Sequence, residues 1–320
     1  MLQYGLAAVL GRMRLPSVQG SLLDQINALY ERIQNGALEP DDLISAGDVR
    51  YDQHLDRALE EIYRSRRAHK KSFKSFIPTF DIFRTFSSDQ VVLDVGAHWG
   101  YSAVTIRHSG CAARIVSIEA MPVNMPPLRH LASLDPKYSC INAAASDSES
   151  ALRFYTPVLN GTAITGLSST GGTLTSYFAA HLAGLTSAYP ARDGRADTVG
   201  VLVTEVASRR IDDILRERGE SDLVVAVKMD IEGHEPSALR GAERLFSAQR
   251  PLLMIEGANR NPDVAELMHC HGYFHAVRAK GYLVPHPGPT DMNDGFWVHP
   301  DKSDGYRAAA ILRGPDPPGV

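Results

Sequence analysis

The 320-residue chain has few cysteines and no strong excess of either charge. Its three cysteines, Cys111, Cys140 and Cys270, are an odd number spread far apart, which does not fit a disulfide framework and favours a reducing compartment. Lysine and arginine total 33, and aspartate and glutamate total 37, a formal net charge of −4. We therefore expect no nucleic-acid partner that binds over the whole surface.

Long apolar runs are also missing. No stretch approaches the roughly 18–20 residues that a membrane-spanning helix requires, so we expect no membrane partner. Near the start of the chain, Arg12 and Arg14 follow a short apolar stretch instead of preceding it, which is the wrong order for a secretory signal. With 44% hydrophobic and 22% charged residues, the composition is that of a folded globular protein, which we expect to be cytoplasmic.

The pattern of apolar residues changes near residue 86. Before it, helical spacing dominates; after it, short β-branched runs alternate with helical patterns, which predicts an α/β fold with a mostly parallel sheet covered on both faces. We expect an N-terminal helical extension over residues 1–86, one domain over residues 87–303 and a tail over residues 304–320. The predicted parallel strands are Val91–Val95, Arg114–Glu119, Cys140–Ala144, Leu223–Met229 and Pro251–Glu256. Tyr273–Val277 and Phe296–His299 are predicted to form an antiparallel hairpin at the edge of the sheet.

A glycine turn connects the first predicted strand to a helix, with the sequence LDVGAHWG at Leu93–Gly100. Gly96 and Gly100 allow the backbone to approach a ligand closely, and the helix that follows offers free N–H groups. The Gly-x-x-x-Gly spacing departs from the Gly-x-Gly-x-x-Gly of dinucleotide sites, which argues against NAD or FAD. A loop for a nucleoside ligand and a purely structural turn are the two alternatives.

An acidic residue, Glu119, ends the next predicted strand, 25 residues after Asp94. At this place in a strand–helix–strand unit, a carboxylate can accept hydrogen bonds from both hydroxyls of a ribose. The alternative is a solvated carboxylate at the end of a strand. The glycine turn upstream favours the ribose.

Titratable side chains crowd the end of the strand predicted at Leu223–Met229. Asp230, Glu232 and His234 follow it at alternate positions, and Glu235 begins a helix. Ligands of open α/β sheets bind at this edge, and crowded carboxylates shift one another's pKa values, a cost tolerated mainly at functional sites. For Glu235 we expect helix capping.

These motifs, in this order, resemble those of a known family. Leu93–Ser102 resembles the first motif of class I S-adenosylmethionine-dependent methyltransferases. Lys228–Leu245, with the sequence DIEGHE followed by LRGA, resembles the signature of the FkbM-type methyltransferases. The resemblance covers roughly residues 85–302, and three further segments agree in order and spacing: Asn142–Asp147, Arg210–Leu215 and Pro251–Glu256.

The resemblance implies a Rossmann-like class I methyltransferase fold, with a mostly parallel seven-stranded sheet, an antiparallel edge strand and an N-terminal helical extension. It also implies S-adenosylmethionine as the cofactor, whose methionine part lies in the glycine turn, whose ribose is held by Glu119 and whose adenine is bordered by Ala143–Ala144. The cofactor site implied in this way comprises Asp94, Gly96, Ala97, His98, Gly100, Tyr101, Ser102, Glu119, Ala120, Ala143 and Ala144. Two residues depart from the family: His98 stands where asparagine is usual, and Ala120 where proline is usual.

The same resemblance implies methylation of a hydroxyl oxygen, which requires removal of the hydroxyl proton. His234 is the natural base, because imidazole titrates near neutrality, and Glu232 can orient it or act itself. Asp230 and Glu256 end neighbouring strands and are candidate ligands for a divalent cation such as Mg²⁺ that acidifies the hydroxyl. We favour the alternative, in which these carboxylates bind the amino acid part of the cofactor.

The acceptor that we expect is a small hydroxylated molecule, with a sugar or glycoside favoured over a polyketide-type metabolite. The sequence contains no Asn-Pro-Pro-Tyr or Asp-Pro-Pro-Tyr tetrad after the fourth strand, which counts against methylation of base amino groups. A non-catalytic nucleoside-binding module is the alternative from another class, although such a protein has no need for the acidic cluster. A homodimer is compatible with the sequence.

Overall fold

The computed structural model describes residues 19–51, 55–73, 77–171, 183–191, 196–257, 261–287 and 294–317. The chain divides into two compact units, each built from two separate stretches. Unit 1 comprises residues 1–54 and 151–206, and unit 2 comprises residues 55–150 and 207–320. These boundaries differ from those expected at residues 86 and 303. Among the described residues, no helix has the length and apolar character needed to cross a membrane.

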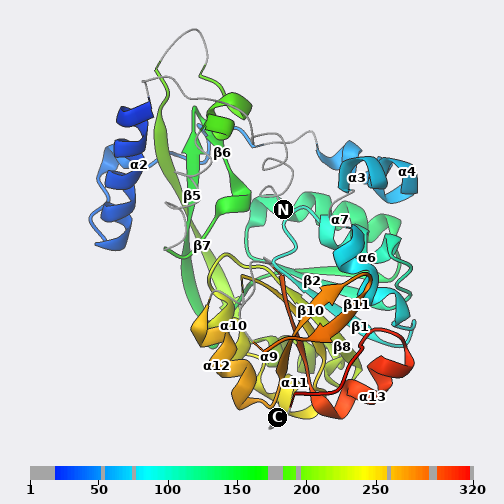
Figure 1. Cartoon of the computed structure of the whole chain (residues 1–320). Helices are drawn as coiled ribbons and strands as arrows, with labels where there is room; N and C mark the ends of the chain where they lie inside the picture. Colours follow the sequence, from blue (N-terminus) through cyan, green and yellow to red (C-terminus); the bar gives the residue numbers. More distant parts are fainter. Residues whose placement is uncertain are drawn as a thin grey trace. The chain divides into compact units, whose positions relative to one another are not determined.

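Unit 2 contains an eight-stranded sheet (Figure 1) in the order β11-β10-β12-β9-β8-β1-β2-β3. Five neighbouring strands are parallel: β3 (Tyr138–Asn142), β2 (Arg114–Glu119), β1 (Val91–Val95), β8 (Val224–Met229) and β9 (Leu252–Glu256). The chain leaves β1 towards β2 and β3 on one side and returns to β8 and β9 on the other. In sheets of this kind, the crevice for a ligand lies where the strand order reverses, at the carboxyl ends of the strands.

The remaining strands of this sheet correct one expectation. The two late strands pair antiparallel as predicted, β10 (Phe274–Ala279) with β12 (Asp294–Val298). However, β12 lies between β10 and β9 and is antiparallel to both, so this pair does not form the edge of the sheet. The outer edge is formed instead by β11 (Tyr282–Pro285), which pairs with β10 and adds an eighth strand. The mostly parallel, Rossmann-like α/β class is confirmed.

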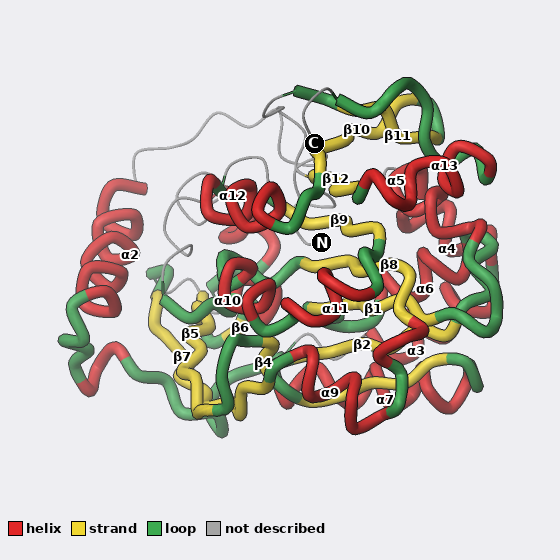
Figure 2. Tube along the Cα trace, turned by 90° about the horizontal axis from the view of Figure 1, so that it is seen from below, coloured by secondary structure: helices red, strands yellow, loops and turns green. Residues whose placement is uncertain are grey.

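The helices of unit 2 form two groups, which Figure 2 shows around the sheet. Because crossovers between parallel strands are right-handed, helices on the two sides of the β1/β8 switch lie on opposite faces of the sheet. One group is α3 (Leu55–Arg64), α4 (Arg66–Phe73), α6 (Tyr101–His108) and α7 (Met125–Leu134). The other is α9 (Ile211–Arg218), α10 (Glu235–Arg240), α11 (Glu243–Ala248) and α12 (Pro262–Cys270). Two short helices, α5 (Ile77–Phe80) and α13 (Pro300–Ala308), complete the unit.

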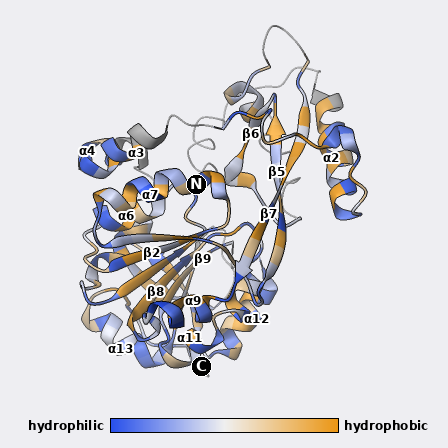
Figure 3. Cartoon of the chain, turned by 180° about the vertical axis from the view of Figure 1, so that it is seen from behind, coloured by the Kyte–Doolittle hydropathy of each residue, from blue (hydrophilic) through white to orange (hydrophobic). Residues whose placement is uncertain are grey.

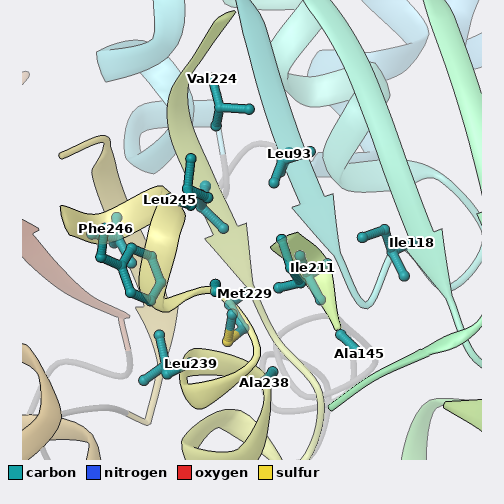
Figure 4. Close-up of a cluster of buried hydrophobic side chains, with 14 of the residues drawn as sticks. Leu93, Ile118, Ala145, Ile211, Val224, Met229, Ala238, Leu239, Leu245 and Phe246 are labelled. Atoms are coloured by element: carbon teal, nitrogen blue, oxygen red, sulfur yellow. The ribbon is translucent and has the colours of Figure 1, made fainter. Parts of the chain in front are cut away.

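The two faces of the central strands carry different side chains. Alternate residues of β1, among them Leu93, join Met229, Leu239 and Phe246 in one buried apolar cluster (Figure 4). Since successive side chains of a strand point to opposite faces, Asp94 lies on the other face, towards α6. The apolar face anchors the sheet, and the second face is able to carry polar groups.

Unit 1 joins an N-terminal helix, α2 (Gln19–Gln34), to strands inserted into the sequence of the larger unit. β5 (Ser150–Leu159) and β7 (Val199–Arg209) are its long strands, and β6 (Thr162–Ala163) pairs with the end of β5. Their apolar residues are orange in Figure 3. The apolar stripe of α2 packs on this sheet in a core made of Leu22, Ile26, Leu29, Ile33, Leu159, Ile164, Leu167, Leu185 and Val201.

Candidate active site

A row of buried polar residues crosses three strands just below the carboxyl edge of the sheet of unit 2. Asp94 on β1 lies directly opposite Ser117 on β2 and Lys228 on β8. Its Oδ2 accepts hydrogen bonds from the hydroxyls of Ser102, at 2.7 Å, and Ser117, at 3.1 Å. Asp94, Ser102 and Ser117 are fully buried. The carboxylate of Asp94 is therefore held by the structure beneath the glycine turn (Gly96–Gly100).

Lys228 connects this row to both functional turns. Its Nζ donates a hydrogen bond to the Gly96 carbonyl at 2.9 Å and lies 3.4 Å from Asp94 Oδ1 and 3.6 Å from Asp230 Oδ2. Burial by itself lowers the pKa of the lysine, but the neighbouring carboxylates outweigh this effect and raise its pKa. Lys228 is therefore a permanent cation between acidic groups.

The glycine turn packs directly against the turn that follows β8. Gly96 has a φ of +79°, and a Cβ built on it lies only 1.8 Å from the Asp230 carbonyl oxygen. The Asp230 N–H donates to the Val95 carbonyl at 3.0 Å, which holds the two turns at this separation. Only glycine permits this approach. Gly96 thus brings the predicted cofactor turn and the predicted catalytic turn into contact.

Glu119 ends β2 and is largely occupied by contacts within the protein. Its Oε2 accepts the His98 N–H at 2.7 Å, and its Oε1 accepts the Met121 N–H at 2.8 Å and the Asn124 side-chain amide at 3.0 Å. Only 6% of the residue is exposed, and burial raises its pKa although these three donors oppose the shift. The carboxylate therefore shapes the glycine turn, whatever it binds in addition.

His98 occupies a left-handed position in the glycine turn, with a φ of +51°. Its ring stacks on that of Trp99, with the centroids 4.1 Å apart and the planes at 30°. Burial lowers the pKa of His98 to about 3, against the opposing charge of Asp230. The imidazole is therefore neutral at physiological pH and lies within the electrostatic reach of the acidic turn (Asp230–His234).

The acidic turn has an unusual backbone. Glu232 has a φ of +54°, a conformation that is strained for a residue with a side chain. Oε1 of Glu235 accepts the Ile231 N–H at 3.1 Å and the Gly233 N–H at 3.3 Å, and its carboxylate also interacts with its own N–H at the start of α10, so it holds the turn in shape as well as capping its helix. Burial, reinforced by Asp230, raises the pKa of Glu232 to about 8. A carboxyl group that titrates near neutrality can accept and release a proton under working conditions.

Asp230 behaves in the opposite way. Burial acts to raise its pKa, but the ammonium of Lys228 and a hydrogen bond with Glu256 outweigh it and lower the pKa below the usual range of a carboxyl group. Asp230 and Glu256 are thus brought together, as predicted from their strand ends. Within the described part of the chain, however, no group of three or more His, Cys, Asp or Glu side chains is placed to hold a metal ion. Lys228 already supplies the positive charge beside Asp230, which does not fit a dication there.

His234 is the N-cap residue of α10, and its ring contacts a different segment. Nε2 lies 3.1 Å from the hydroxyl of Ser146, just after β4 (Ala144–Ala145). Burial lowers the pKa of His234, which leaves the imidazole neutral and able to accept a proton. A second close contact supports this junction, because a Cβ on Gly241 lies 1.9 Å from the Ser146 carbonyl oxygen. The charges that act on His234 are those of Asp147 and Arg240, whereas those on Glu232 include Asp230 and Glu235.

The other predicted cofactor residues lie in or near the same edge of unit 2. Ala97, Tyr101, Ser102, Ala143 and Ala144 are buried, and Ala120 is partly buried. Gly100, with a φ of +89°, is the N-cap of α6. The Ala143 N–H donates to the Glu119 carbonyl at 3.0 Å, which links the predicted adenine border to the predicted ribose residue. Sequence reasoning missed Lys228 as a functional residue, although a lysine inside the apolar run of a buried strand requires a partner and is itself a signal.

Comparison with known proteins identifies the family. Residues 94–282, more than half of the chain, match the Methyltransferase FkbM domain. No curated protein sequence matches this chain. Among solved structures, the FkbM methyltransferase of Methylobacillus flagellatus KT is 15% identical with a TM-score of 0.41, and the match covers 88% of this chain and 60% of that protein. The chain therefore spans less than two thirds of that protein's length.

Two further solved structures are similar to this chain. Fibrillarin from Aeropyrum pernix, determined with natively bound S-adenosyl-L-methionine, is 12% identical, with a TM-score of 0.34 and coverage of 74% of this chain and 75% of that one. Precorrin-6y C5,15-methyltransferase from Geobacter metallireducens GS-15 is 12% identical, with a TM-score of 0.35 and coverage of 69% and 85%. The match over residues 94–282 shows that the chain belongs to the FkbM family of class I S-adenosylmethionine-dependent methyltransferases.

Proposed function

We propose that the protein transfers the methyl group of S-adenosylmethionine to a hydroxyl oxygen of a small molecule, with a saccharide or glycoside as the favoured acceptor. The observation that carries this proposal is the contact between the two turns. Gly96 allows the glycine turn to pack on the Asp230 backbone, so groups suited to hold a cofactor lie beside groups suited to move a proton.

The residues present fit S-adenosylmethionine at the carboxyl ends of β1, β2 and β8. The glycine turn would bind the methionine part, the Oε2 of Glu119 retains capacity to accept from a ribose hydroxyl, and the stretch at Ala143–Ala144 would border the adenine. The acidic turn would lie near the positively charged part of the cofactor. When bound, S-adenosylmethionine supplies the activated methyl group.

The chain's own part in the reaction is to align the acceptor oxygen and to remove its proton. Alignment contributes several kcal/mol to lowering the barrier, and a positioned base contributes about 10²–10⁴-fold in rate. Two groups are able to take the proton. The pKa of Glu232 is about 8, and the pKa of His234 is lowered by burial, so its imidazole is neutral and can accept a proton. Asp230 remains ionised and contributes negative charge.

The choice of a saccharide acceptor rests on the resemblance of the motifs and not on a pocket. A polyketide-type hydroxyl acceptor and a non-catalytic nucleoside-binding module are the alternatives. Calorimetric titration of the full chain with S-adenosylmethionine, followed by a screen of turnover against sugars, glycosides and phenolic polyketides, separates the three. Binding with turnover on glycosides supports the proposal. Binding without turnover on any acceptor favours the module, and absence of binding contradicts the proposed function.

The same experiment addresses the metal. We expect turnover to survive EDTA, because the lysine ammonium already compensates Asp230. Loss of activity with EDTA that Mg²⁺ restores would return Asp230 and Glu256 to the role of metal ligands. A cytoplasmic location and a homodimer remain proposals that fractionation and light scattering can test.

A further inference from the structure

The Lys228 side chain contacts the glycine turn, the buried polar row and the acidic turn at once. It is 4% exposed, and its Nζ lies near three oxygens: Gly96 O in the glycine turn at 2.9 Å, Asp94 Oδ1 on β1 at 3.4 Å and Asp230 Oδ2 in the acidic turn at 3.6 Å. The hydrogen bond to the Gly96 carbonyl is the short contact, and the two carboxylates are ion-pair neighbours that hold the buried ammonium in place.

The contact with Gly96 has a specific consequence. Lys228 donates to the carbonyl of the peptide between Gly96 and Ala97, and the N–H of that peptide faces the Ile118 carbonyl at 3.4 Å. The contact with Lys228 is the shorter of the two that orient this peptide. A glycine has little conformational preference of its own, so this orientation must come from its contacts. We propose that Lys228 is a positioning residue that holds the glycine turn in its cofactor-binding conformation against the acidic turn. This inference rests on the proposed function, because it assigns the glycine turn to S-adenosylmethionine.

A charge-balancing role is the competing explanation. Removal of the ammonium leaves Asp94 and Asp230 buried without a cation, which destabilises a protein whether or not the turn is positioned. The two roles predict different behaviour when the excess charge is also removed. The substitution Asp94→Asn keeps the shape of the side chain, and the amide oxygen can still accept from Ser102 and Ser117, so this variant provides the background for that comparison.

The first experiment measures S-adenosylmethionine affinity by calorimetry in a four-variant cycle. Lys228→Met in the wild-type background and in the Asp94→Asn background should each weaken binding by about ten-fold or more, the effect of losing a hydrogen bond from a charged donor. If Lys228 only balances charge, the double variant, in which Lys228, Asp94 and Asp230 together carry the same net charge as in the wild type, should recover the affinity that Lys228→Met alone loses. That result would overturn the proposal.

A matched control is available on the same unit. Lys137 Nζ also donates to a backbone carbonyl, that of Ala112 at 3.3 Å, but the side chain is exposed. Lys137→Met should leave the affinity within about two-fold of wild type, since exposed polar contacts contribute little. Lys228→Arg, which retains the charge but carries a larger, planar group, serves if Lys228→Met does not fold, and it should also lose affinity.

The second experiment needs no cofactor. The chain has two tryptophans, Trp99 in the glycine turn and Trp297 on β12, so 5-fluorotryptophan labelling gives two ¹⁹F resonances, assigned with a Trp99→Phe variant. In Lys228→Met, the Trp99 resonance should shift or broaden while that of Trp297 remains, and Lys137→Met should change neither. If the Trp99 resonance is unchanged in a folded Lys228→Met protein, the inference is contradicted. If wild type binds no S-adenosylmethionine, the proposed function fails, and this resonance still decides the role of Lys228.

Discussion

The glycine turn and the acidic turn lie at the ends of neighbouring parallel strands and are in contact. The carboxylate beside the first turn and the one in the second turn differ in their surroundings. Glu119, beside the glycine turn, accepts three hydrogen bonds from backbone and amide donors. Burial raises the pKa of both carboxyl groups, but Glu232, in the acidic turn, is on a strained backbone and the charge of Asp230 adds to the shift, which brings its pKa to about 8. The comparison indicates that hydrogen bonds to Glu119 keep the glycine turn in one conformation, whereas Glu232 allows the acidic turn to change its protonation.

The largest expected effect comes from separating the two turns. Gly96→Val places side-chain atoms where the Asp230 carbonyl lies, so we expect no detectable S-adenosylmethionine binding and a loss of at least about 3 kcal/mol in the free energy of unfolding. Calorimetry and urea denaturation measure the two quantities. Gly219→Ala is the control, because Gly219 has a φ of +65° but nothing within 4 Å of its Cβ. Binding that survives Gly96→Val would show that the contact between the turns is dispensable.

The next effect distinguishes the two candidate bases. We expect His234→Asn to lower kcat by about 10²-fold and to leave cofactor affinity almost unchanged, because a base acts in the transition state. Glu232→Gln should have the same consequence if the carboxylate is the base. The pH profile of kcat separates them. If Glu232 is the base, kcat should rise up to about pH 8; if His234 is the base, kcat should reach its plateau below pH 6.5. If His234→Asn retains wild-type kcat, Glu232 becomes the base.

A smaller effect tests the constant shape of the first turn. Glu119→Ala removes the acceptor of three hydrogen bonds and should weaken S-adenosylmethionine binding by about 1.5–3 kcal/mol, the scale for hydrogen bonds to a charged group. Glu220 is the matched control, since it is also buried but its carboxylate bonds Arg114 and Arg218. Glu220→Ala should destabilise the protein without a comparable loss of affinity. Equal affinities in Glu119→Ala and wild type would remove Glu119 from the cofactor site.

A further effect concerns the pH dependence of stability that Glu232 produces in the acidic turn. Because the pKa of Glu232 is about 8 in the folded protein against an ordinary value of 4.5, the unfolded chain ionises first, and stability falls as pH rises from 4.5 to about 8. Glu232→Gln should reduce this decline. Glu232→Gly should in addition relieve the left-handed strain and stabilise the fold by about 1 kcal/mol while activity falls. Thermal unfolding at pH 5 and pH 8 measures both, and a destabilised Glu232→Gly protein would argue against stored strain.

The central strands could be predicted from the sequence because they are buried on both faces. Val91–Val95 and Arg114–Glu119 are short runs rich in valine and isoleucine, and both match the structure residue for residue. The long strands β5 and β7 were not predicted, since they are partly exposed and their apolar and polar residues mix without a clear period. The residues of the site were predicted from motif order, but their contacts were not: that His234 meets Ser146, and that Lys228 meets Gly96, depends on pairing between distant strands.

The interleaved order of the two units constrains how the chain can fold during synthesis. The apolar face of α2 leaves the ribosome before its partners in β5 and β7, from which it is separated by residues 55–150 of the other unit. The first three strands of the large sheet likewise form before β8, the neighbour of β1, exists. Neither unit can close until residues beyond 200 have emerged. A nascent chain therefore exposes two incomplete cores at once, a period in which chaperones have most to bind.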